Sequence, residues 1–299
     1  MEQIKKIDIH AHVTRHPQLI PANPANDQPM VGVERLLAMY DELNIEKGVL
    51  LPLVTPEAQW VIMTNEDCKL IADEHPDRFV WFCSIDPRMG KNTDTSDLTY
   101  LLEHYKKLGA RGMGELTAQL FTDDPKMDNL FSCLEDLDMP LTIHIAPHFD
   151  GCYGIVDELG LPRLERMLKK HPRLRIFGHS QCFWSEISAD NDDEIRRKYP
   201  TGKVIEGRIA QLMRRYENLY CDLSAGSGKN AMMRDPEYAV SFLEEFSDRI
   251  LYGCDICAAT NKHPYQFDEF LTSLRASGAI REETYRKIVR ENAEKLLGL

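Results

Sequence analysis

The sequence of 299 residues has no long apolar run, and none reaches the roughly 18 residues that a membrane-spanning helix needs. Its N-terminus carries no apolar signal region. Basic residues are in deficit, with 36 Lys and Arg against 48 Asp and Glu, and the net charge is −12. This balance argues against a broad surface for nucleic acid or for an anionic membrane. We therefore expect a cytoplasmic protein whose partner is a small molecule.

Two further patterns are missing. The eight cysteines are scattered without a framework of paired spacings, so we expect them to be reduced rather than bridged. Cys254 and Cys257 have the spacing of a zinc knuckle, but no second pair accompanies them. No Gly-x-Gly-x-x-Gly turn is present, which counts against an open nucleotide-binding sheet.

Short apolar segments alternate along the chain with longer amphipathic ones. The apolar segments predict eight strands, at residues 5–13, 47–54, 78–85, 111–116, 141–146, 175–179, 219–223 and 250–255. The amphipathic segments predict helices at 32–43, 56–75, 96–108, 126–138, 161–171, 204–216, 236–246 and 264–277. Eight strand–helix units whose strands are almost continuously apolar are typical of a closed parallel barrel. We therefore predict an α/β protein with a (β/α)8 TIM barrel.

Two connections are longer than a barrel requires. Residues 15–31 follow the first strand and residues 181–202 follow the sixth, both on the side where such barrels build their active sites. Residues 283–299 predict one or two final helices. A hydrophobic content of 43% suffices for a large core. We expect residues 1–299 to form a single hydrolase-like barrel domain, with extended loops after strands 1 and 6 and with C-terminal helices.

The first strand carries two histidines, His10 and His12, separated by one residue. Because side chains alternate along a strand, both imidazoles point to the same side. Two neighbouring imidazoles at the end of a strand form half of a metal site. Asp8 lies deeper on the same strand, and we expect it to make a buried hydrogen bond.

Other metal-binding side chains lie at the ends of later strands. Glu115 ends the fourth strand, His144 lies on the fifth, His179 ends the sixth and Asp255 ends the eighth. The C-terminal ends of all strands meet at one face of a barrel. Separate buried core histidines would explain any one of these residues but not the whole set. The pattern therefore predicts a metal centre at this face.

The order of these residues resembles the amidohydrolase superfamily of metal-dependent barrel enzymes, and most closely its amidohydrolase-2 branch. That branch includes aminocarboxymuconate-semialdehyde decarboxylase and related decarboxylases, hydratases and lactonases. The motifs that carry the resemblance are Ile7-Asp8-Ile9-His10-Ala11-His12, Ile176-Phe177-Gly178-His179-Ser180, Leu251-Tyr252-Gly253-Cys254-Asp255 and the last segment, 291–299. They span essentially the whole chain, and they identify the superfamily rather than the reaction.

The resemblance implies a role for each residue of the set. His10, His12, His144 and Asp255 would bind a divalent metal, with zinc expected and manganese, iron or cobalt also compatible with these ligands. Asp255 would also take a proton from the metal-bound water and return it to the leaving group. His179 would either bind a second metal or contact the water and the substrate.

Glu115 is where the sequence departs from the decarboxylases of the branch, which do not usually carry a metal-binding glutamate on strand 4. The segment Gly112-Met113-Gly114-Glu115 is more similar to TatD-type hydrolases, in which this glutamate bridges two metals. In that arrangement His144 and His179 would bind the second metal. Glu115 could instead orient a histidine from behind. We expect Glu115 to be a metal ligand. The number of metals per chain is expected to be one or two.

Residues near the strand ends are further candidates. Arg15 follows the first strand and could bind a substrate carboxylate, and His148 follows the fifth strand and could line the pocket. Trp184 follows the sixth strand, where an aromatic side chain could form a pocket wall. Asp222 and Ser224 end the seventh strand and could orient the substrate.

We predict a metal-dependent hydrolase in which a metal-bound hydroxide attacks an ester, lactone or amide carbonyl of a small molecule. The first alternative is a metal-dependent decarboxylase of a small unsaturated or aromatic carboxylic acid, which a single metal would favour. The second is a metal-binding scaffold without catalysis, although every expected ligand position is filled. A homodimer is possible for this branch, and the fold alone does not decide among these functions.

Overall fold

The computed structural model describes residues 3–57 and 59–299. A strand overlaps each of the eight predicted segments. These strands are β1 (Lys6–Ala11), β2 (Ile45–Leu50), β3 (Phe79–Trp81), β4 (Met113–Leu116), β5 (Leu141–Ala146), β7 (Ile176–His179), β8 (Leu219–Asp222) and β9 (Ile250–Leu251). An additional short strand, β6 (Ile155–Val156), pairs with the end of β5 and was not predicted.

The strands form a closed parallel barrel. One sheet has the order β1-β2-β3 and the other has the order β4-β5-β7-β8-β9, and every pairing is parallel. Backbone hydrogen bonds join the two sheets at both edges. Cys83 N donates to Gly112 O over 3.0 Å beyond β3, and Asp255 N donates to His10 O over 2.8 Å beyond β9. The predicted TIM barrel is therefore confirmed.

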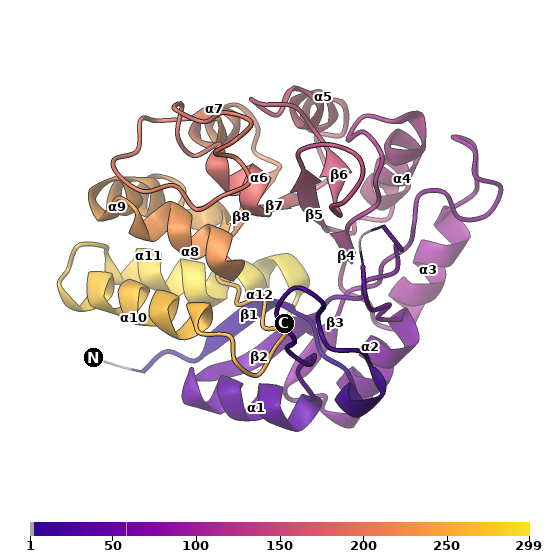
Figure 1. The fold of residues 1–299 in the computed structure, drawn as a ribbon, viewed down its shortest axis with the longest axis horizontal. Coiled ribbons are helices and arrows are strands. Elements are labelled where there is room, and N and C mark those ends of the chain that lie inside the picture. Colours follow the sequence, from indigo (N-terminus) through magenta and orange to yellow (C-terminus); the bar gives the residue numbers. More distant parts are fainter. Residues whose placement is uncertain (1–2, 58) are drawn as a thin grey trace.

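Helices surround the barrel, as Figure 1 shows. They are α1 (Val33–Glu42), α2 (Asn65–Glu74), α3 (Thr99–Lys107), α4 (Pro125–Asp136), α5 (Pro162–Lys170), α6 (Gln181–Ser185), α7 (Arg208–Arg215), α8 (Ala225–Met233), α9 (Pro236–Glu245), α10 (His263–Ala276), α11 (Glu282–Arg286) and α12 (Asn292–Leu297). Short 3-10 turns lie at η1 (Pro17–Leu19) and η2 (Ser247–Arg249), and η3 (Lys287–Glu291) is a π-helical segment. No helix in the described part of the chain is both long and apolar enough to cross a membrane.

Two predicted segments need correction, and one helix near the site was not predicted. The helix predicted at 56–75 covers only α2, because Thr64 caps its N-terminus by accepting a hydrogen bond from Asp67 N over 3.1 Å. The segment 181–202, predicted to be a loop, begins with α6. The helix α8 was not predicted, because its sequence contains two glycines and little apolar periodicity. A Cβ at Gly228 would lie 2.2 Å from Leu223 O, so α8 packs closely on the end of β8.

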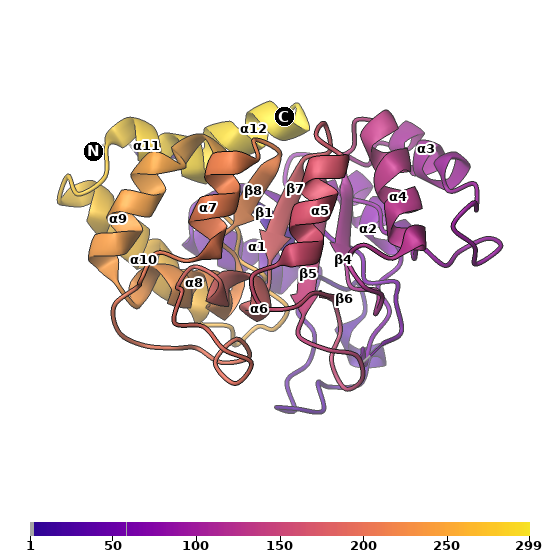
Figure 2. The ribbon, with the colours of Figure 1, turned by 90° about the horizontal axis from the view of Figure 1, so that it is seen from above.

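The two ends of the barrel differ. In Figure 2 the loops that follow the strands gather at one end, whereas α12 lies at the opposite end. Ala293 and Leu297 of α12 pack on a buried cluster of strand side chains that includes Ile7, Phe82 and Phe177. This apolar packing closes one end of the barrel. The other end is left for the polar strand ends and their loops.

Candidate active site

The six predicted metal-binding residues converge at the C-terminal end of the barrel. They come from β1 and its extension, from β4, β5 and β7, and from the segment after β9. Their ligand atoms form three overlapping groups in which the atoms of each group lie within 4.8 Å of one another. The groups are His10 with His12 and Glu115, His10 with His179 and Asp255, and Glu115 with His144 and His179.

Glu115 lies between two sets of histidines. Its Oε2 is 3.5 Å from His12 Nε2 and 3.9 Å from His10 Nε2. Its Oε1 accepts a hydrogen bond of 2.6 Å from His144 Nδ1 and lies 3.7 Å from His179 Nε2. Burial alone would raise the pKa of Glu115, but the nearby histidines hold this pKa well below its usual range. The carboxylate is thus ionised, with one oxygen facing each set.

Asp255 completes the side of the centre that faces His10 and His12. Its Oδ1 lies 3.7 Å from His10 Nε2 and 3.6 Å from His12 Nε2. The side chain is 23% exposed, whereas the Glu115 side chain is 4% exposed. Asp255 is therefore the carboxylate of the cluster that water and substrate can reach.

Asp222 contacts the nitrogens of His10 and His179 that face away from the centre. The sequence had suggested instead that Asp222 could orient the substrate. Asp222 Oδ2 accepts a hydrogen bond of 2.6 Å from His10 Nδ1 and lies 3.4 Å from His179 Nδ1. Ser224 Oγ is 3.0 Å from the same His179 nitrogen. Carboxylates that bind the far nitrogen of an imidazole fix its orientation at a metal site. Both histidines therefore present Nε2 to the centre.

His10 carries a positive charge at the centre. Its Nδ1 donates to Asp222 Oδ2 over 2.6 Å, and its Nε2 lies 3.1 Å from His12 Nε2. His12 Nδ1 donates to Leu51 O over 2.9 Å. Burial opposes this charge, but the carboxylates of Asp222, Asp255 and Glu115 raise the pKa of His10 to about 10.

The donor set fits a divalent cation. Imidazole nitrogens and carboxylate oxygens are ligands that zinc, manganese, iron and cobalt accept. Burial and the charge of His10 lower the pKa of His179 to about 4, so His179 is neutral at pH 7 and can offer a lone pair. Buried carboxylates and imidazoles packed this closely are costly without an ion that they share.

Two cavities meet at this centre. The first, which we call the Arg197 cavity, has a volume of about 410 Å³, and the second, the Trp60 cavity, has a volume of about 330 Å³. Each is large enough to hold a small ligand. Both are lined by the same four residues, His144, Tyr153, His179 and Asp255. A substrate that reaches the centre can therefore extend into both.

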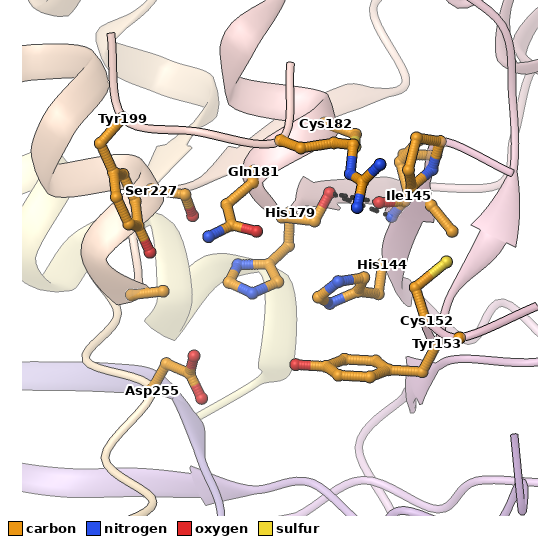
Figure 3. A pocket seen from close by; sticks show the side chains of 16 residues that line it. His144, Ile145, Cys152, Tyr153, His179, Gln181, Cys182, Tyr199, Ser227 and Asp255 are labelled. Atoms are coloured by element: carbon orange, nitrogen blue, oxygen red, sulfur yellow. Dashed lines mark hydrogen bonds between the residues drawn. The ribbon is translucent and has the colours of Figure 1, made fainter. Parts of the chain in front are cut away.

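Tyr153 is a site residue that the sequence analysis missed. Its ring lies against His144, with ring centroids 4.5 Å apart, and Figure 3 shows its hydroxyl pointing across the cavity toward Asp255. Burial, and then the charges of Glu115 and Asp255, raise the pKa of Tyr153, which keeps the hydroxyl protonated. It lies in an irregular segment before β6, where a tyrosine two residues after a glycine has no distinguishing signal.

The structure does not bring the three predicted substrate-binding residues to the centre. Arg15 forms an ion pair with Glu74. His148 is exposed and donates from Nδ1 to Phe149 O over 2.7 Å. Trp184 is buried and donates from Nε1 to Asp222 O over 2.9 Å, so it anchors the end of β8 from the core. Among the described residues that line the two cavities, none of the three appears.

Comparison with known proteins shows the family of the chain. The family model of the amidohydrolase-2 branch, described as amidohydrolase, matches residues 7–299. The chain belongs to this amidohydrolase family. Curated proteins show no significant sequence match to it.

Solved structures similar to this amidohydrolase share its fold at low sequence identity. The 5-carboxyvanillate decarboxylase from Sphingomonas paucimobilis has a TM-score of 0.66 and 17% identity, with 99% of this chain and 100% of that one covered. A dihydroxybenzoic acid decarboxylase from Polaromonas with bound manganese has a TM-score of 0.61 and 18% identity, with 99% and 98% covered. A probable 2-pyrone-4,6-dicarboxylic acid hydrolase from Acinetobacter baumannii has a TM-score of 0.61 and 16% identity, with 99% and 100% covered.

Proposed function

We propose that this amidohydrolase is a metal-dependent hydrolase that cleaves an ester, lactone or amide bond of a small molecule. The observation that carries the proposal is the position of Glu115, whose two carboxylate oxygens face two different sets of histidines. A carboxylate placed in this way can be shared by two cations. A pair of cations suits the activation of water and the stabilisation of the oxygens in a displacement.

The residues divide into ligands and proton-handling groups. His10, His12, Glu115 and Asp255 would hold one cation, and Glu115, His144 and His179 would hold the other. Such cations supply a lowered pKa for water and polarisation of the substrate carbonyl. The partly exposed carboxylate of Asp255 accepts the proton of the attacking water and returns it to the leaving group. The protonated Tyr153 hydroxyl donates a hydrogen bond to the carbonyl oxygen as it becomes negative.

Metal content per chain tests the proposal. We expect about two divalent cations per chain in protein reconstituted with zinc or manganese and measured by elemental analysis. The Glu115→Gln variant is expected to retain at most about one, because an amide is a poor bridging ligand. Glu186→Gln is a matched control, since Glu186 is also buried but accepts hydrogen bonds from Gly160 N and Asn191 Nδ2. The control should keep the full metal content.

Activity supplies the second arm of this test. The metal-loaded protein is assayed on a panel of carboxylic esters, lactones and amides, and hydrolysis is followed by the acid that is released. Asp255→Asn should lower kcat by a factor of about 100 or more, because general acid–base catalysis contributes this much. Retained hydrolysis in this variant would contradict the role of Asp255. Absence of cation binding after reconstitution would overturn the enzyme proposal as a whole.

A decarboxylase is the second candidate, favoured by the names of two structural neighbours, a 5-carboxyvanillate decarboxylase and a dihydroxybenzoic acid decarboxylase. In this case Glu115 only orients His144 through their hydrogen bond of 2.6 Å, and one cation suffices. Asp255 or His179 would then deliver a proton to the carbon that loses the carboxylate. About one cation per chain, together with release of carbon dioxide from an aromatic acid, would replace the hydrolase proposal with this one.

A further inference from the structure

The Arg197 cavity contains a positive charge that the protein does not neutralise. Arg197 is the one Lys or Arg among the described residues that line either cavity. It forms no ion pair with any described residue, whereas the neighbouring Lys198 pairs with Glu194 over 3.4 Å. In a chain with a net charge of −12, an unpaired guanidinium beside a cavity is well suited to an anionic group of a ligand.

The same cavity is also lined by a serine hydroxyl, that of Ser227, without a hydrogen-bond partner among the described residues. Ser227 is 4% exposed. Several other buried side-chain atoms also lack a partner, but Ser227 Oγ is the one among them that lines the Arg197 cavity, so its hydroxyl is free to bond a ligand atom there. Figure 3 shows Ser227 beside Gln181 and Tyr199 on the wall of the cavity. The Arg197 guanidinium and the Ser227 hydroxyl line the same cavity, and each can donate a hydrogen bond to an anionic ligand.

The Trp60 cavity has a different character. Its wall includes Met30, Leu53 and Val61, which belong to one buried apolar cluster against which Trp60 packs. No Lys or Arg is found among its described lining residues. An indole beside aliphatic side chains favours a flat apolar group over a charged one.

We propose that the substrate is elongated, with a carboxylate that binds Arg197 and Ser227 at one end and an apolar, preferably aromatic, group that packs on Trp60 at the other. The bond that reacts lies between these ends, where the two cavities meet at His144, Tyr153, His179 and Asp255. The inference rests on the proposed function only for the nature of this bond. The assignment of the two ends comes from the cavities themselves.

Binding of unreactive probes tests the assignment without turnover. The manganese-loaded protein is titrated by calorimetry with 4-phenylbutyrate, with its uncharged amide 4-phenylbutanamide, and with butyrate, which lacks the ring. Wild-type protein should bind 4-phenylbutyrate about tenfold or more tightly than either of the others, because a charge-assisted contact and an aromatic contact are each worth this much.

Two variants test the carboxylate end and the apolar end of the ligand separately. Arg197→Met should bring the affinities for 4-phenylbutyrate and its amide within about twofold of each other, while the advantage over butyrate remains. Trp60→Ala should bring the affinities for 4-phenylbutyrate and butyrate within about twofold of each other, while the advantage over the amide remains. Trp60→Phe should restore most of the preference for the ring. Lys198→Met is the matched control: it removes one positive charge at the adjacent position but lines neither cavity. It should leave both preferences unchanged.

Each contrary outcome has a distinct meaning. A preference for the carboxylate that survives in Arg197→Met would show that another group holds it, and would overturn the inference. Equal affinity of the wild-type protein for all three probes would overturn it as well. A protein that shows the expected selectivity yet hydrolyses no ester, lactone or amide would overturn the proposed function instead and leave this inference standing.

Discussion

At the scale of single residues, the proton on His10 links the hydrogen bonds of the centre to its affinity for cations. The Nε2 atoms of His10 and His12 lie 3.1 Å apart, so a proton on His10 Nε2 faces His12. A cation that binds both nitrogens must displace this proton. Because the pKa of His10 is raised to about 10, the proton is present at neutral pH and competes with the cation.

Cation binding should therefore release about one proton from His10, and apparent affinity should rise as the pH increases from 6 to 9. The sign follows from the raised pKa, since raising the pH toward it removes the competing proton. Calorimetric titration with zinc or manganese in buffers of different ionisation enthalpy measures the number of protons released. Heats that do not depend on the buffer would contradict the prediction.

Asp222 should contribute to metal affinity without binding the metal, because its carboxylate holds His10 through a hydrogen bond of 2.6 Å. Replacing such a carboxylate typically lowers metal affinity by about 10- to 100-fold. Asp222→Asn should show this loss in a competition titration with a chromogenic chelator. Asp157→Asn is a suitable control, because Asp157 is equally buried but accepts a hydrogen bond from Leu164 N at the start of α5. A similar loss in both variants would indicate general destabilisation instead.

At the scale of elements, the barrel strands could be predicted because they are short apolar runs at regular intervals. The helices α6 and α8 could not be predicted, because long-range packing rather than local propensity stabilises them. α6 has only five residues, and its position depends on Phe183, whose ring lies against Gly178 of β7. The sequence pattern contains no trace of such a contact between residues on different elements.

Gly178→Ala tests how firmly this contact positions α6. A Cβ at residue 178 would lie 2.2 Å from the Phe183 ring, so the ring and α6 must shift. We expect a loss of about 1–3 kcal/mol in the free energy of unfolding, measured by urea denaturation. The displaced α6 should also weaken binding in the Arg197 cavity, which Gln181 and Cys182 line. In Gly32→Ala the new Cβ would meet only the Pro17 ring at 3.2 Å, and the effect should be smaller.

At the scale of the whole molecule, the barrel topology explains why one part of the site could be predicted and another could not. Residues such as His10, His144 and Asp255 lie at or just beyond strand ends, and a closed parallel barrel brings these ends together whatever the loops do. Tyr153 and Arg197 lie on long connections. Their positions depend on contacts between loops, such as the hydrogen bond of 2.9 Å from Gly154 N to Thr117 O.

The same topology predicts that a bound cation stabilises the entire fold. The residues that would hold the first cation, His10, His12, Glu115 and Asp255, come from β1 and its extension, from β4 and from the segment after β9, and this last segment bonds to β1 where the two sheets meet. Unfolding must therefore separate the ligands and release the cation. At a free cation concentration of 100 times Kd, one site should add about 2.7 kcal/mol to the free energy of unfolding.

Thermal denaturation with increasing zinc or manganese should show a rising Tm that a chelator reverses. His12→Ala, which removes one ligand, should fold without the cation but lose most of this concentration dependence. An equal rise in Tm for both proteins would place the stabilising cation elsewhere.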